Sequence, residues 1–141
     1  MTTYRLDLDV LPAMSNDTEP TNIETILSGL TVAPAVAQYV EALNHAAVEY
    51  ANKRGYAFVD KFTIVRLAKY VKVISSTLYV ETGQLSNTHV HSFVDPTTGG
   101  VYKPAGWKAP AKGERYNLST PEGLDRLIAA LDPTGRYLYI R

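Results

Sequence analysis

Cations and aromatic side chains alternate in two parts of this sequence, and this combination can bind nucleic acid. The ten residues concerned are Lys69, Tyr70, Lys72, Tyr102, Lys103, Trp107, Lys108, Lys112, Arg115 and Tyr116. Lysine and arginine neutralise phosphates, and aromatic rings stack on unpaired bases. The structural alternative is that Trp107 fills the core beneath a loop while the lysines are only solvated. Dedicated nucleic-acid binders are usually basic, whereas this chain has 14 cations and 14 acids, so both interpretations stay open.

Two histidines two positions apart are a weaker candidate for a metal site. His89 and His91 lie on a predicted strand, where residues two apart point to the same side, and imidazoles bind zinc. The set is incomplete, because His45 lies on a predicted helix and the chain contains no cysteine. A structural histidine pair on an exposed strand explains the spacing at least as well. We therefore expect neither a metal nor a cofactor.

Acid/base catalysis has little support in the sequence. The triplet Phe-Val-Asp occurs twice, ending at Asp60 and at Asp95, each time after a predicted strand. Asp95 precedes Pro96, which is typical of a turn. The sequence contains no GxSxG, HExxH or GxxxxGK[ST] motif. We expect a non-enzymatic protein, and an enzyme built on the two histidines and two aspartates is the remaining alternative.

We expect one soluble α+β domain spanning residues 1–141. Length and composition indicate the single soluble domain, and the predicted helices and strands described below indicate the α+β class. The apolar fraction is 45% and the charged fraction is 20%. The sequence has no apolar run near the ~20 residues of a membrane span, so we expect no membrane partner. Its first residues lack the pattern of a secretory signal. Charge is uneven, because residues 1–25 are acidic and residues 53–72 and 101–116 are basic.

The elements that must position these residues begin with an N-terminal strand and two helices. We predict an acidic strand and loop over residues 1–20, with the strand at 4–10. Thr21 and Glu24 have capping-box spacing before a short helix at 22–28 that ends at Gly29. The clearest helix covers 34–53, with Thr31 as its cap and a buried stripe at Val36, Val40, Leu43, Ala47 and Tyr50.

An antiparallel β-meander is predicted over residues 62–104. Residues 62–67 fit a strand or a short helix, residues 69–76 are the firmest strand, and 83–87 is a turn. Strands at 88–94 and 101–103 flank a Pro/Gly turn. A Trp/Lys loop covers 104–116, and a C-terminal helix covers 121–131 with Thr120 as its cap and Leu124, Leu127, Ile128 and Leu131 as its stripe. A final strand is predicted at 136–140. We expect the two main helices to pack on one face of the sheet.

Residues 93–117, FVDPTTGGVYKPAGWKAPAKGERYN, resemble a family of small uncharacterised bacteriophage proteins with an FVDxxTGxVYKPAGWKAPAKGxRYN-like motif. The motif joins a strand, a turn ending in Gly99, a Tyr102-Lys103 strand, the Trp107–Lys112 loop, and Arg115 and Asn117. The strand at 69–73 is also similar to that family. The resemblance implies phage origin, with action in the cytoplasm of an infected bacterium or in the virion. It implies no catalytic role.

Two functions therefore compete. The first is a small non-enzymatic phage protein that binds nucleic acid through a basic and aromatic sheet and loop surface. The second is a protein-interaction module, acting as a modulator of a host factor or host defence, or as a homo-oligomeric structural phage component. Ten tyrosines favour the second, because tyrosine, tryptophan and arginine are enriched at interfaces.

Overall fold

The structure is a computed structural model, and it describes residues 23–139 apart from the side chain of Glu24. The predicted strand at 4–10 and the capping box at Thr21 lie outside the described residues. The elements in chain order are α1 (Ile23–Ile26), α2 (Ala33–Arg54), β1 (Phe58–Arg66), β2 (Val71–Tyr79), β3 (Leu85–Val94), β4 (Gly100–Tyr102), β5 (Tyr116–Asn117), α3 (Pro121–Ala130) and the 3₁₀ helix η2 (Arg136–Leu138).

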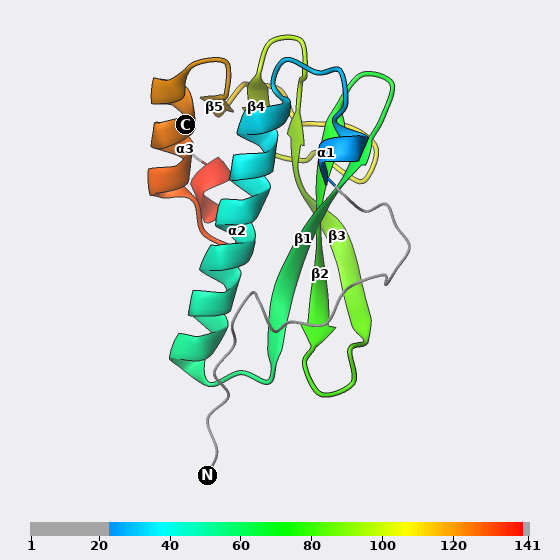
Figure 1. Cartoon of the computed structure of the whole chain (residues 1–141), viewed down its shortest axis with the longest axis vertical. Coiled ribbons are helices and arrows are strands. Elements are labelled where there is room, and N and C mark those ends of the chain that lie inside the picture. The colour runs from blue at the N-terminus through cyan, green and yellow to red at the C-terminus, as the bar shows by residue number, and fades with distance from the viewer. Residues whose placement is uncertain (1–22, 140–141) are drawn as a thin grey trace.

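The five strands form one antiparallel sheet in the order β1-β2-β3-β4-β5. Each strand therefore pairs with the next one along the chain, which is a meander. Figure 1 shows α2 and α3 on the same side of the sheet, with α2 alongside β1. The predicted fold, a single α+β domain with a meander and two main helices on one face, is confirmed.

Helix α2 follows from its apolar spacing. Val36, Val40, Leu43 and Ala47 are buried, as the three- and four-residue steps predict. Gly55 ends the helix in the left-handed region at φ 69°, and its N–H donates to the carbonyls of the last turn. The prediction that Thr31 caps the helix is wrong. Val32 occupies that position, and its aliphatic side chain cannot accept a cap bond. The helix begins at Ala33, whose N–H donates to the Leu30 carbonyl.

Asn44 of α2 binds the outer edge of β1. Its side-chain oxygen accepts from the Phe62 N–H at 2.8 Å, and its amide donates to the Phe62 carbonyl at 3.1 Å. An edge strand has unpaired backbone groups, and this contact satisfies two of them. The contact therefore holds α2 alongside the sheet.

Some predicted strand bounds need correction. Residues 62–67 are strand rather than helix up to Arg66, and β1 begins earlier, at Phe58. Strand β3 begins at Leu85, inside the predicted 83–87 turn, and its pairing with β2 shifts twice. One shift leaves His91 as an extra residue between the pairs Ile74–Val90 and Val73–Ser92, which is a β-bulge.

The predicted C-terminal strand at 136–140 is wrong over its described part. Gly135 has φ 85°, and a 3₁₀ turn follows with Leu138 N–H donating to the Gly135 carbonyl. Tyr137 is buried whereas Tyr139 is 60% exposed, so the two tyrosines do not share a face. The alternation of aromatic and aliphatic residues in the sequence suggested a strand, in which neighbouring side chains point to opposite faces. Tyr137 and Leu138 are adjacent and both buried, which fits a turn.

Helix α3 begins as predicted, with Pro121 in its first turn and the Thr120 side chain accepting from the Gly123 N–H. Leu124 and Leu127 are buried, but Ile128 is exposed, so the predicted stripe is too wide. The helix is short, and its buried side meets α2 and β5.

The sheet has two different faces. The inner face packs on the helices and includes Phe62, Ile64, Val71, Val73, Val94 and Val101. The outer face is defined by Lys72, Ile74, Val90, Phe93 and Tyr102, which pair across β2, β3 and β4. Because the bulge at His91 reverses the alternation, Val90 and Phe93 lie on the same side although they are three residues apart.

Candidate functional site

The Trp/Lys loop is a small hairpin with Trp107 near its tip. Pro104 bridges to Pro110, the Ala111 N–H donates to the Lys103 carbonyl at 2.9 Å, and Ala105 N–H donates to the Ala109 carbonyl at 3.0 Å. The loop, yellow in Figure 1, extends past β3, away from α2 and α3. Trp107 is 51% exposed, so the interpretation of Trp107 as a core residue is wrong.

Lys72 lies against the ring of Trp107. Its Nζ is 4.1 Å from the Trp107 ring centroid and 5.9 Å from that of Phe93. Lys72 is only 5% exposed, and within residues 23–139 it forms no ion pair with a carboxylate. A desolvated cation over an aromatic ring contributes about 2 kcal/mol. The ammonium of Lys72 therefore holds Trp107 in place from beneath.

Three more of the predicted residues, Lys69, Tyr70 and Tyr102, lie close to Lys72 and Phe93 on the outer face. Tyr70 makes edge contacts with Phe93 at 5.8 Å and with Tyr102 at 6.5 Å between ring centroids. Lys69 Nζ lies 5.4 Å from the Tyr70 ring centroid. We call the set of Lys69, Tyr70, Lys72, Tyr102 and Trp107 the outer-face cluster.

Three other predicted residues are engaged elsewhere. Arg115 Nε donates to the Leu138 carbonyl at 2.8 Å and Nη1 donates to the Gly113 carbonyl at 2.9 Å. Tyr116 lies on β5, packs against the inner core and donates to the Tyr137 carbonyl at 3.3 Å. Lys103 Nζ lies 4.5 Å from the ring centroid of Tyr139. The structure therefore separates these three candidate residues from Trp107, because they fasten the loop and β5 to the C-terminal turn.

The two remaining cations of the set, Lys108 and Lys112, are exposed on the loop. Lys108 follows Trp107 directly, and Lys112 comes just after Ala111, whose N–H closes the hairpin on Lys103. Both residues therefore add positive charge to the segment that carries Trp107.

A pocket of about 340 Å³ lies between the loop and the open edge of β3. Thr88, His89 and Val90 line it on the strand side, and Pro104 to Trp107 line it on the loop side. The edge is open here because β4 pairs only with Phe93 and Val94. The structure thus brings His89 and Trp107 to one pocket, which the sequence spacing did not indicate.

The two histidines are not placed as a metal pair. His89 is exposed, with Nδ1 3.1 Å from the Asn87 carbonyl oxygen, whereas His91 is buried. The buried ring of His91 is engaged through Nε2 by the Tyr137 hydroxyl and is not paired with the exposed ring of His89. Across the part of the chain that the structure describes, no group of three or more histidine, cysteine, aspartate or glutamate side chains could hold a metal ion.

His91 belongs to a buried polar chain that the sequence did not reveal. Its Nε2 lies 2.7 Å from the Tyr137 hydroxyl, which lies 2.7 Å from the Tyr39 hydroxyl, which lies 2.8 Å from Ser92 Oγ. Burial lowers the pKa of His91 to about 4 and raises the pKa of Tyr39 to about 12. All four groups are therefore neutral near pH 7. The chain ties α2, β3 and η2 together.

The two Phe-Val-Asp aspartates have separate environments. Asp60 lies inside β1 and not after a strand, where burial raises the pKa of its carboxyl and His89 opposes the shift. Asp95 Oδ1 accepts from the N–H groups of Thr97 at 2.9 Å and Thr98 at 3.3 Å, so Asp95 is the turn former that the sequence predicts.

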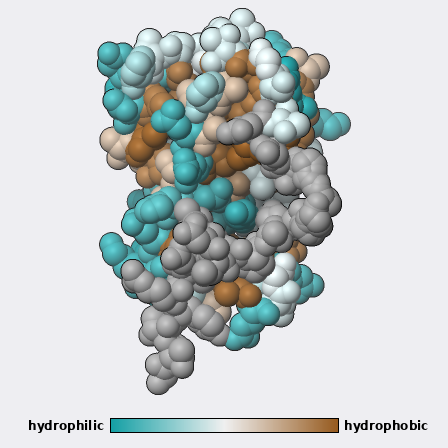
Figure 2. Space-filling model, viewed as in Figure 1, coloured by the Kyte–Doolittle hydropathy of each residue, from teal (hydrophilic) through white to brown (hydrophobic). Residues whose placement is uncertain are grey.

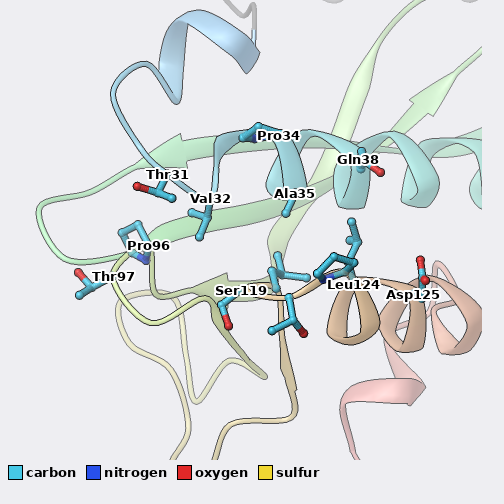
Figure 3. Close-up of a pocket in the computed structure, with 13 residues that line it drawn as sticks. Thr31, Val32, Pro34, Ala35, Gln38, Pro96, Thr97, Ser119, Leu124 and Asp125 are labelled. Atoms are coloured by element: carbon cyan, nitrogen blue, oxygen red, sulfur yellow. The ribbon is translucent and has the colours of Figure 1, made fainter.

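A larger pocket, of about 740 Å³, opens between the first turns of α2 and α3 (Figure 3). Its lining comes from the α1–α2 connection, α2, the β3–β4 turn, the β5–α3 segment and α3. The labelled residues of Figure 3 include Val32, Pro96, Ser119 and Leu124, which come from distant parts of the sequence. This distance explains why no local motif indicated the pocket.

Within residues 23–139, none of the helices is long and apolar enough to cross a bilayer. Searches of curated proteins and of solved structures gave no match to this chain. One family model, described as a family of unknown function (DUF7717), matches residues 17–140, and the chain belongs to that family.

Proposed function

We propose that this protein binds single-stranded nucleic acid, without catalysis, at the loop that carries Trp107. One observation carries the proposal: Trp107 is 51% exposed although Lys72 holds its ring in a fixed place. Exposing a large aromatic ring costs hydrophobic free energy, and an ordered exposed ring provides a stacking platform at little entropic cost.

The charges near Trp107 support the same function. Lys69, Lys108 and Lys112 are exposed and can neutralise phosphates, while Trp107 stacks on a base. Lys72 is buried, so its role here is to position Trp107 and not to contact phosphate. The proposed interface does not include Lys103, Arg115 or Tyr116, because each of them contacts the C-terminal turn.

The pocket beside Trp107 favours single strands over a duplex. It is about 340 Å³, and His89 lies on its strand side. An unstacked base can enter such a pocket, whereas the bases of a duplex are stacked and paired. Sequence readout is not required, since every base has a face that stacks.

The single tryptophan gives a direct test. We expect oligo-dT or oligo-U to quench Trp107 fluorescence, and Trp107→Ala to weaken binding of a dye-labelled oligonucleotide by about 1–3 kcal/mol per stacked base. Tyr56→Ala, at an exposed aromatic residue on another part of the surface, is the matched control and should bind normally. Absence of both quenching and anisotropy change at low salt would refute the proposal.

A protein-interaction function is the second candidate, and an exposed aromatic row favours it. Tyr56 stacks on Phe58 with ring centroids 4.8 Å apart, and Phe58 contacts Tyr79 at 6.0 Å. All three are exposed, which is a typical composition for an interface. Light scattering tests this candidate: a homo-oligomer that dissociates when Phe58 is replaced by serine would support it. A monomer at all concentrations would exclude self-association.

Three further expectations depend on the sequence resemblance and stay predictions. They are phage origin, action in the host cytoplasm or in the virion, and a host or phage protein as partner.

A further inference from the structure

Two pockets meet at the β3–β4 turn and form one groove. The pocket of Figure 3, about 740 Å³, and a neighbouring pocket of about 510 Å³ share Pro96 and Thr97 in their linings. The first continues between α2 and α3, and the second continues past Leu30 to the β1–β2 turn. We call the two together the turn groove.

The middle of the turn groove is apolar. Val32, Leu118 and Leu124 are buried residues that line the first pocket, and Pro34, Pro96 and Pro121 line it as well. Figure 2 shows hydrophobic residues gathered in the upper part of this face, where α1, α2 and α3 lie in the same view of Figure 1. Such a lining suits an aliphatic or proline side chain.

One end of the turn groove is acidic. Asp125 is the charged residue among those that line the first pocket, and Figure 3 places it on the same side as Gln38. The helix starts offer few N–H donors to an anion there, because Pro34 and Pro121 have none and the Gly123 N–H is bonded to Thr120. This end therefore favours a cationic group.

The other end is basic. Arg66 and Lys69 line the second pocket, and both are exposed. Arg66 donates to the carbonyls of Ile26 and Ser28, which orients the guanidinium without neutralising it. Asp95 lines the same pocket, and its Oδ1 accepts from the Thr97 and Thr98 N–H groups, so the lining holds two cations against one carboxylate. This end favours a carboxylate.

We propose that the turn groove binds an extended peptide segment of a partner protein. The segment places a lysine or arginine at Asp125, an aliphatic or proline residue over Val32 and Leu124, and an acidic residue or C-terminal carboxylate at Arg66 and Lys69. A chain of opposite charges around an apolar centre matches the groove, whereas a polyanion is repelled at the Asp125 end. Lys69 belongs to both surfaces, but the rest of the turn groove is separate from the Trp107 loop, and peptide binding there does not depend on nucleic-acid binding.

The test is selection of a random peptide display library on the immobilised full chain. We expect enriched peptides with a basic residue and an acidic residue on opposite sides of an apolar one. The best peptide, synthesised with a dye, should lose about tenfold in affinity for Asp125→Lys, and the same peptide with its basic residue replaced by glutamate should regain it.

Glu122→Lys is the matched control, because it makes the same charge change on the same helix at a residue outside the groove lining. It should leave the affinity within about twofold. Circular dichroism of both variants checks that α3 remains folded. Selection without an enriched pattern would overturn the proposal, as would a peptide whose affinity responds equally to Asp125→Lys and Glu122→Lys.

Discussion

Among the lysines and arginines of residues 23–139, Lys72 is the one that is buried, and its ammonium lies against aromatic rings. Only 5% of the residue is exposed, and Trp107 and Phe93 are the partners of Nζ. The desolvation cost of the charge and the gain from the rings oppose each other, so the net effect on stability is small. The effect on the order of the Trp107 ring is larger, since one of its sides rests on this cation.

Replacement of Lys72 by methionine separates these two effects. Methionine keeps the packing of the side-chain stem and removes the charge, so the unfolding free energy should change by no more than about 1 kcal/mol. Trp107 should lose its support, with higher quenching by acrylamide and lower steady-state fluorescence anisotropy. Lys72→Arg, which keeps a cation under the ring, is the control. Equal quenching of Lys72→Met and the native protein would contradict the positioning role.

His91 makes stability depend on pH. Burial lowers its pKa from 6.5 to about 4, His89 lowers the pKa further, and Asp132 opposes the shift. Above pH 6.5 the histidine is neutral in both the folded and the unfolded chain, so its contribution is fully present. Between pH 6.5 and 4 the unfolded state takes up the proton first, and stability falls by about 3 kcal/mol in total. Below pH 4 both states are protonated and the loss stops.

Urea titrations at several pH values measure this dependence. In the native protein the unfolding free energy should decrease as pH falls from 6.5 to 4. In His91→Gln, whose amide nitrogen can replace the contact of Nε2 with Tyr137, the decrease should be smaller by most of that amount. A variant with the same slope as the native protein would show that other groups cause the pH dependence.

At the scale of elements, the sequence predicts best where burial follows a regular period. The 34–53 helix and the 121–131 helix agree with α2 and α3 to within a residue at each end, because their buried residues follow the helical repeat. The bulge at His91 and the 3₁₀ turn at Arg136 could not be predicted. Both carry members of the buried chain of His91, Tyr137, Tyr39 and Ser92, which joins residues up to 98 positions apart.

Gly123 lies in α3 at a position where the neighbouring strand leaves no room for a side chain. In a helix, alanine ordinarily stabilises relative to glycine by about 1 kcal/mol. A Cβ at Gly123, however, would lie 1.9 Å from the Asn117 carbonyl oxygen, which is backbone and cannot rotate away. We therefore expect Gly123→Ala to destabilise the protein by about 2–3 kcal/mol.

Gly106→Ala is the control, since nothing lies within 4 Å of a Cβ at that position and its φ is not positive. Its unfolding free energy should stay within about 0.5 kcal/mol of the native value. Thermal and urea unfolding of both variants measure the difference. A Gly123→Ala protein as stable as the native one would show that α3 does not approach β5 this closely.

At the scale of the whole molecule, the sequence indicated the composition of the candidate site better than its geometry. Lys69, Tyr70, Lys72, Tyr102 and Trp107 do gather in the outer-face cluster. Lys103 does not, because it follows Tyr102 directly and adjacent strand residues point to opposite faces. Sequence distance also hid the turn groove, whose walls come from segments about 90 residues apart in the chain.

The zero net charge limits how much electrostatics can contribute to nucleic-acid binding. Without a global positive field, attraction depends on the exposed cations near Trp107, namely Lys69, Lys108 and Lys112. If each neutralises one phosphate of a single strand, the logarithm of the binding constant should fall with the logarithm of salt concentration with a slope of about −2.

The double variant Lys108→Ala/Lys112→Ala should reduce the slope to about −0.7. The double variant Lys53→Ala/Arg54→Ala removes the same charge from the C-terminal end of α2 and should leave the slope unchanged, because those cations are outside the interface. Equal slopes for the two double variants would show that binding, if present, is general attraction and not a contact made at the Trp107 loop.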